Sequence, residues 1–182
     1  MTLNLPTGNT AMLSITELSV TDAVEIAAWV GGMIRADQVT TLTEEVARVL
    51  SGWDGFALIL NGVTSLSEGA AQALAAWKGV VLSLNGVSTI DAGTAQALAL
   101  WKGDELVLGL RTMSLAVAAA LATWEGRFLS LRLTETSNEA AHAFLTMRVA
   151  RRYSQYAEAR DCFCSRCGDI IVEQCRGLLE IG

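Results

Sequence analysis

The segment FALILNGVTSLSEGAAQALAAWKG, residues 56–79, is followed directly by VVLSLNGVSTIDAGTAQALALWKG, residues 80–103. These two 24-residue segments share their apolar positions, an Asn-Gly pair and a final Trp-Lys-Gly. Looser copies of the pattern occupy residues 33–55, 104–126 and 127–149. Self-similarity at a fixed period of about 20 to 50 residues is the signature of stacked repeat architectures. The repeat therefore predicts the fold class before any single motif is considered.

Tryptophan recurs with the same period. The five tryptophans are Trp29, Trp53, Trp77, Trp101 and Trp124, with successive spacings of 24, 24, 24 and 23 residues. In the last unit Met147 stands at the equivalent position. The tryptophans share the phase of the apolar residues in their units, so we expect them to lie in a common core. The alternative is an exposed aromatic row that stacks sugars or bases.

Each unit opens with a short strand. Leu58 and Leu60 alternate with their neighbours, and this period of two is typical of a strand that buries one face. The Asn-Gly pairs at 61–62 and 85–86 predict turns that end two of the strands.

A helix is predicted in the second half of each unit. Between Ala70 and Trp77 the apolar residues recur at i, i+3, i+4 and i+7, which indicates one face of a helix of about three turns. Each predicted helix follows a residue whose side-chain oxygen can cap free backbone N–H groups. These residues are Thr43, Ser67, Asp91, Ser114 and Ser137. We expect glycines to end the helices in a left-handed backbone conformation. They are Gly55, Gly79, Gly103 and Gly126.

A unit of one strand and one short helix cannot bury its apolar face alone, so it must stack on copies of itself. The predicted fold is therefore α/β: a short parallel-stranded solenoid of about five to six units over residues 1–149. Terminal repeats need a cap that covers the open end of the core. We assign this role to residues 150–182, a predicted helical segment that contains a cysteine cluster.

The units resemble the short leucine-rich-repeat-like units that occur in tandem in some bacterial proteins. The resemblance covers residues 10–149, and the Asn-Gly pairs at 61–62 and 85–86 occupy the turn where leucine-rich repeats generally place asparagine. The chain departs from that pattern in its few leucines per unit, its regular tryptophan and the missing asparagine in units 104–126 and 127–149. The resemblance implies protein–protein recognition by a leucine-rich-repeat-like surface, without catalytic residues.

The composition excludes several classes of protein. The 182 residues are 52% apolar and 18% charged with a single proline, which excludes a disordered or collagen-like chain. We expect no membrane span, because no segment combines the necessary length and apolarity. The first basic residue is Arg35, so we expect no secretory signal and a cytoplasmic location.

Charge is distributed unevenly. The net charge of −6 argues against nucleic acid as a partner, because neutralising phosphates requires a basic surface. Residues 1–147 hold 7 basic and 14 acidic side chains, whereas residues 148–182 hold 6 basic and 5 acidic ones. This change indicates a boundary near residue 148.

The strand residues that alternate with the buried leucines form a candidate partner-binding face. They are Ala57, Ile59, Val81, Ser83, Glu105, Val107, Phe128 and Ser130. One of the eight is charged, whereas a solvated strand face is normally polar. We interpret this face as a docking surface for another protein or for self-association. The alternative is a short, flat sheet of small residues that merely tolerates water.

Enzyme activity is not expected. His142 is the single histidine, and it has no adjacent serine or cysteine to form a nucleophilic pair. The sequence contains no P-loop, HExxH or GxSxG motif.

All four cysteines lie near the C-terminus: Cys162, Cys164, Cys167 and Cys175. The C-x-x-C-G spacing of Cys164 and Cys167 lets two thiolates reach one tetrahedral zinc ion. A four-ligand zinc site would add Cys162 and Cys175, or His142 in place of Cys162. The alternatives are unligated structural cysteines, and redox or iron–sulfur chemistry.

Two functions are therefore predicted. The first is a non-catalytic interaction scaffold that uses the sheet face, with or without the basic cluster of Arg148, Arg151 and Arg152. The second is a zinc-binding regulatory or nucleic-acid adaptor that acts through the C-terminal cysteine module. Solvated charge on a capping helix is the simpler interpretation of the arginine cluster.

Overall fold

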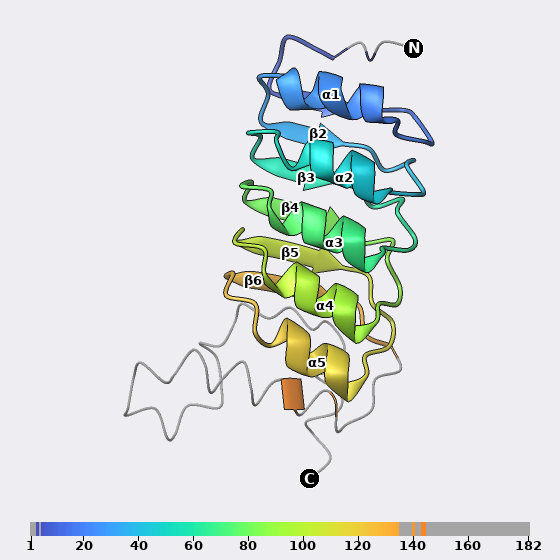
Figure 1. Cartoon of the computed structure of the whole chain (residues 1–182), viewed down its shortest axis with the longest axis vertical. Helices are drawn as coiled ribbons and strands as arrows, with labels where there is room; N and C mark the ends of the chain where they lie inside the picture. The colour runs from blue at the N-terminus through green and yellow to red at the C-terminus, as the bar shows by residue number, and fades with distance from the viewer. Residues whose placement is uncertain (1–2, 4, 135–139, 141–142, 145–182) are drawn as a thin grey trace, which may run out of the picture.

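Strands and helices alternate along the chain. A computed structural model describes residues 3, 5–134, 140 and 143–144. Its elements are β1 (Thr10–Met12), α1 (Val20–Ala28), β2 (Met33–Arg35), α2 (Glu44–Leu50), β3 (Ala57–Ile59), α3 (Glu68–Ala75), β4 (Val81–Leu84), α4 (Ala92–Ala99), β5 (Glu105–Leu108), α5 (Leu115–Leu121) and β6 (Phe128–Leu131). In Figure 1 the helices stack side by side in chain order, and the strands run behind them. The predicted α/β repeat solenoid is confirmed for these units.

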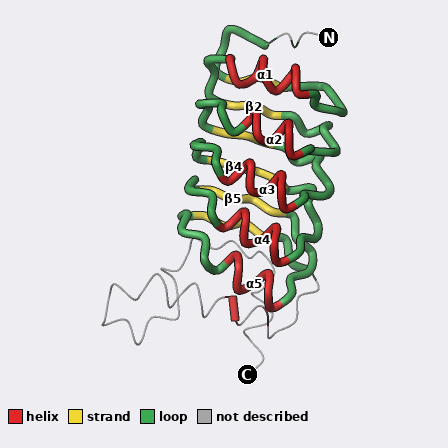
Figure 2. Tube along the Cα trace, viewed as in Figure 1, coloured by secondary structure: helices red, strands yellow, loops and turns green. Residues whose placement is uncertain are grey.

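The strands form one parallel sheet in the order β1-β2-β3-β4-β5-β6. Each residue pairs with its equivalent in the next unit, so Leu58 lies opposite Leu82, and Leu82 lies opposite Leu106. The described helices all lie on one face of this sheet (Figure 2). The strand residues that point toward the helices are buried, as the period-two pattern predicts. They include Ala11, Ile34, Leu58, Leu82, Leu106 and Leu129.

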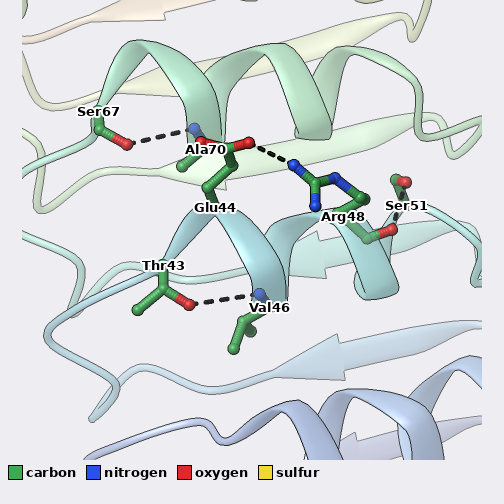
Figure 3. A network of polar contacts seen from close by, with 7 residues as sticks. All are labelled: Thr43, Glu44, Val46, Arg48, Ser51, Ser67 and Ala70. Atoms are coloured by element: carbon green, nitrogen blue, oxygen red, sulfur yellow. Dashed lines mark hydrogen bonds and ion pairs between the residues drawn. The ribbon is translucent and has the colours of Figure 1, made fainter.

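Side chains cap the helices at predicted positions. Thr43 Oγ1 accepts a hydrogen bond from the backbone N–H of Val46 at 3.3 Å, and Ser67 Oγ accepts one from Ala70 at 3.2 Å (Figure 3). Ser114 caps α5 in the same way. Each cap satisfies a backbone donor that has no partner within its own helix.

Asp91 caps α4 with a carboxylate. Its Oδ1 accepts a hydrogen bond from the backbone N–H of Thr94 at 2.7 Å. This bond, supported by one from the Thr94 side chain, lowers the pKa of the Asp91 carboxyl below its ordinary value. The cause is that hydrogen bonds to the charged form favour ionisation.

The helices are shorter than the apolar spacing predicts. Helix α3 ends at Ala75 with Ala76 as its C-cap, so Trp77 lies beyond the helix and not on its apolar face. Trp101 likewise follows the C-cap residue Leu100 of α4. The tryptophan keeps the i+7 spacing because the chain turns back toward the core directly after the C-cap residue. Its side chain is therefore buried although the residue lies in a loop.

The tryptophans form a continuous column. Neighbouring rings have centroids 5.9 to 6.1 Å apart. Successive rings from Trp53 to Trp124 lie within 4° of parallel to one another, whereas the Trp29 ring is inclined by 17° to that of Trp53. Each of these four indole Nε1 atoms donates to the backbone carbonyl of the preceding tryptophan, at 2.8 to 3.1 Å. Trp29 donates instead to the carbonyl of Pro6. The core position is confirmed for the four later tryptophans, which are buried, whereas Trp29 is half-buried.

The glycine two residues after each of the tryptophans from Trp53 to Trp124 has a different role from the predicted one. None of the described glycines has a backbone φ in the left-handed region, and the helices end before Gly79 and its equivalents. A Cβ atom on Gly79 would lie 2.0 Å from Cζ2 of Trp77. The same overlap occurs at Gly55, Gly103 and Gly126. Glycine is required here because the indole ring folds back over it.

The last predicted unit, 127–149, is described only in part. The structure describes residues 127–134, which include β6, and buried helical residues at Ala140 and Phe144. Ser137, Met147 and the boundary between residues 149 and 150 lie outside the described residues, as does the predicted cap at 150–182. None of the described helices is long and apolar enough to cross a membrane.

Candidate functional site

The sheet face opposite the described helices carries two rows of side chains that run across the strands. The first row comprises Thr10, Met33, Ala57, Val81, Glu105 and Phe128. The second row comprises Met12, Arg35, Ile59, Ser83, Val107 and Ser130. We call these two rows the open face.

The eight predicted docking residues all belong to the open face, but they are unequally accessible. Phe128 is 38% exposed, whereas Ala57 is 1% and Ser83 8% exposed. The others are half-buried: Ile59, Val81, Glu105, Val107 and Ser130. Exposure at Ala57 and Ser83 was therefore wrongly expected.

Cross-strand neighbours explain the two buried positions. Ala57 lies in register between Met33 and Val81, whose longer side chains flank its methyl group. Ser83 lies between Ile59 and Val107, and its Oγ donates to Asn61 Oδ1 at 2.7 Å. A partner would therefore contact the larger neighbours of these residues.

The predicted docking residues leave out the N-terminal part of the open face. Met12 is 73% exposed, Met33 is half-buried and Arg35 is exposed, where it forms an ion pair with Asp37 at 2.9 Å. The repeat period could have predicted these residues, because β2 lies 24 residues before β3 and 24 is also the spacing of the tryptophans. The looser match of the first units to the consensus hid these residues.

A small hollow lies at the β6 end of the open face. It has a volume of about 170 Å³ and is lined by Glu105, Phe128, Leu129 and Ser130. The guanidinium carbon of Arg127 lies 5.4 Å from the centre of the Phe128 ring, a cation–π distance. This end of the face therefore combines an aromatic ring and a carboxylate with the guanidinium group of Arg127.

The candidate metal and basic residues cannot be placed on this surface. Cys162, Cys164, Cys167, Cys175 and His142 lie outside the described residues, as does the cluster of Arg148, Arg151 and Arg152. Among the residues that the structure does describe, no three His, Cys, Asp or Glu side chains are grouped to hold a metal ion. The zinc site stays a prediction.

Comparison of the chain with models of known protein families, with curated proteins and with solved structures found no match.

Proposed function

We propose that this chain is a non-catalytic scaffold that binds another protein through the open face. The observation that carries the proposal is exposed apolar surface where a sheet in contact with water is normally polar. Met12 and Phe128 are exposed at its two ends, and Ile59, Val81 and Val107 are half-buried between them. Apolar side chains that gather on one accessible face mark interaction sites in proteins.

The rigidity of the sheet supports the same function. Six strands pair in continuous parallel register, so the open face is ordered before any partner arrives. The tryptophan column and its indole hydrogen bonds tie each unit to the one before it. A preorganised surface loses less conformational entropy on binding than a flexible one does.

We further propose that the solenoid is of the leucine-rich-repeat-like kind. The support is the role of Asn61, whose Oδ1 accepts a hydrogen bond from the backbone N–H of Asn85 at 3.2 Å. The asparagine side chain thus links one turn of the solenoid to the next, at the predicted turn position.

The test compares two doubly acidic variants. Val81→Glu with Val107→Glu places two carboxylates on the open face. Gln72→Glu with Gln96→Glu adds the same charge on exposed positions of α3 and α4 and serves as the control. Each variant and the wild type are used to capture proteins from the source cells, and their masses are measured by light scattering after size exclusion.

We expect the wild type and the helix-face control to retain the same partner, and the open-face variant to lose it while keeping its circular dichroism spectrum. If the open-face variant captures the same proteins as the wild type and has the same mass, the open face is not the docking surface. A wild-type dimer that the open-face variant alone dissociates identifies the partner as a second copy of the chain.

A further inference from the structure

A second hollow lies away from the open face, where the chain turns after β4, β5 and β6. It has a volume of about 620 Å³, which is within the range of small-molecule sites. The described residues that line it include Asn85, Arg111, Arg132 and three threonines. None of these described lining residues is an Asp or a Glu.

The hollow coincides with the loss of one residue from the repeat. Strands β4 and β5 stay in register, with Leu84 opposite Leu108. Asn85 and Gly86 follow Leu84, but Gly109 follows Leu108 directly. A Cβ on Gly109 would meet the carbonyl oxygen of Asn85, as one on Gly86 would meet that of Asn61. Gly109 therefore takes the place of Gly86, and the unit lacks an asparagine.

This deletion leaves an acceptor without a donor. Asn61 Oδ1 accepts hydrogen bonds from Ser83 Oγ at 2.7 Å and from the backbone N–H of Asn85 at 3.2 Å. One unit later Val107 stands opposite Ser83 and offers no hydroxyl, and the equivalent backbone donor has been deleted. Asn85 Oδ1 is consequently buried without a hydrogen-bond partner among the described residues. A buried acceptor in this state is unfavourable unless a ligand or water supplies a donor.

The unit with the deletion and the unit after it each contribute one arginine to the lining of the hollow. The backbone N–H of Arg111 donates to the backbone carbonyl of Ser88 at 3.0 Å, in the column of turn residues that earlier units fill with Thr40 and Thr64. Arg132 directly follows Leu131, so it stands where the preceding unit has Gly109. Within the described part of the chain, neither guanidinium forms an ion pair or a side-chain hydrogen bond.

We propose that this hollow binds a small phosphomonoester that carries hydroxyl groups. Arg111 and Arg132 hold the phosphate, because planar guanidinium groups match phosphate oxygens with paired hydrogen bonds. Two guanidinium charges balance a phosphate dianion, whereas a single carboxylate would leave one of them unbalanced. When the ligand binds, the Asn85 carboxamide turns so that Oδ1, which is buried in the free protein, accepts a hydrogen bond from a ligand hydroxyl and regains the donor that the deletion removed.

The test titrates glycerol 3-phosphate, inorganic phosphate and glycerol into the full chain, followed by calorimetry and by amide NMR shifts. We expect saturable one-to-one binding of glycerol 3-phosphate, weaker binding of inorganic phosphate and none of glycerol. Arg111→Ala with Arg132→Ala weakens binding of glycerol 3-phosphate by about 10-fold or more. Arg48→Ala removes a similar charge from α2, where Arg48 pairs with Glu44 (Figure 3), and leaves the affinity unchanged.

Asn85→Ala separates the two halves of the proposal. The substitution weakens the binding of glycerol 3-phosphate by about 3- to 10-fold, which is the effect of one hydrogen bond. The affinity for inorganic phosphate stays unchanged. The proposal is overturned if glycerol 3-phosphate shows no saturable binding up to about 10 mM. It is also overturned if Arg48→Ala weakens binding as much as the double variant does, since general charge attraction then explains the result.

Discussion

Gly79→Ala destabilises the protein only while the indole ring of Trp77 is present. The new Cβ would lie 2.0 Å from ring carbon Cζ2, whereas non-bonded carbons sit about 3.5 to 4.0 Å apart. The ring must then move by about 1.5 Å. It is stacked between Trp53 and Trp101 at centroid distances of 6.0 and 5.9 Å, and its Nε1 is hydrogen-bonded at 2.8 Å. We expect a cost of about 3 kcal/mol, at the upper end of overpacking effects.

In a Trp77→Ala background the same substitution has the opposite sign. The ring is absent, and the backbone of Gly79 is not left-handed. Gly79→Ala then stabilises by about 0.4 to 1 kcal/mol through the unfolded state. The coupling energy between the two sites is therefore about 3 to 4 kcal/mol. Urea unfolding followed by circular dichroism measures the stability of the wild type, the two single variants and the double variant, which together form a double-mutant cycle.

If the effects of Gly79→Ala and Trp77→Ala on the free energy of unfolding are additive within about 0.5 kcal/mol, this explanation is refuted. Gly79 would then be needed for its backbone conformation and not for the space that the indole ring occupies. Trp77→Ala alone removes about 3 to 5 kcal/mol, which is a large part of a typical domain stability. If it prevents folding, the terminal pair Trp29 and Gly31 provides the same test. A Cβ on Gly31 would lie 2.1 Å from the Trp29 ring, and Trp29 is half-buried, so its removal costs less.

Two further predictions concern the turns and a helix cap. Asn61→Ala lowers the free energy of unfolding by about 1 to 3 kcal/mol, because it leaves the Ser83 hydroxyl and the Asn85 N–H without their acceptor. Asn85→Ala lowers it by less than about 1 kcal/mol in the absence of ligand, because Asn85 Oδ1 has no hydrogen-bond partner among the described residues. Urea midpoints of the two variants check this order, and equal losses would contradict it. The pKa of Asp91 is lowered in the folded state, so its charge stabilises the fold above the unfolded pKa, and this contribution disappears as pH falls through the folded pKa. The stability difference between wild type and Asp91→Asn, which keeps a capping oxygen, should therefore shrink in acid; a difference independent of pH would refute the assignment.

The repeating units could be predicted from sequence because each depends on local patterns. The alternation around Leu58 and Leu82 predicted the strands, and the oxygen-bearing side chains of Thr43, Ser67 and Asp91 predicted the helix starts. The period itself implied the parallel sheet, since equivalent residues of successive units must lie opposite each other. These features require no knowledge of side-chain orientation.

Features that depend on contacts between units could not be predicted in this way. The spacing of the tryptophans does not reveal that each indole donates to the preceding tryptophan carbonyl, or that the ring covers Gly79. Burial of Ala57 depends on the sizes of Met33 and Val81, which are its neighbours only once the register is known. The 23-residue spacing before Trp124 signals a deletion, but only the sheet register places it at Gly109.

The indole column is the feature on which the solenoid and its open face depend, and hydrogen exchange of the indole N–H groups tests it most directly. In a protein labelled with nitrogen-15, the N–H groups of Trp53, Trp77, Trp101 and Trp124 should exchange slowly, at rates set by unfolding of the stack. The N–H of the half-buried Trp29 should exchange faster. Five indoles that all exchange within seconds would contradict the stacked interior.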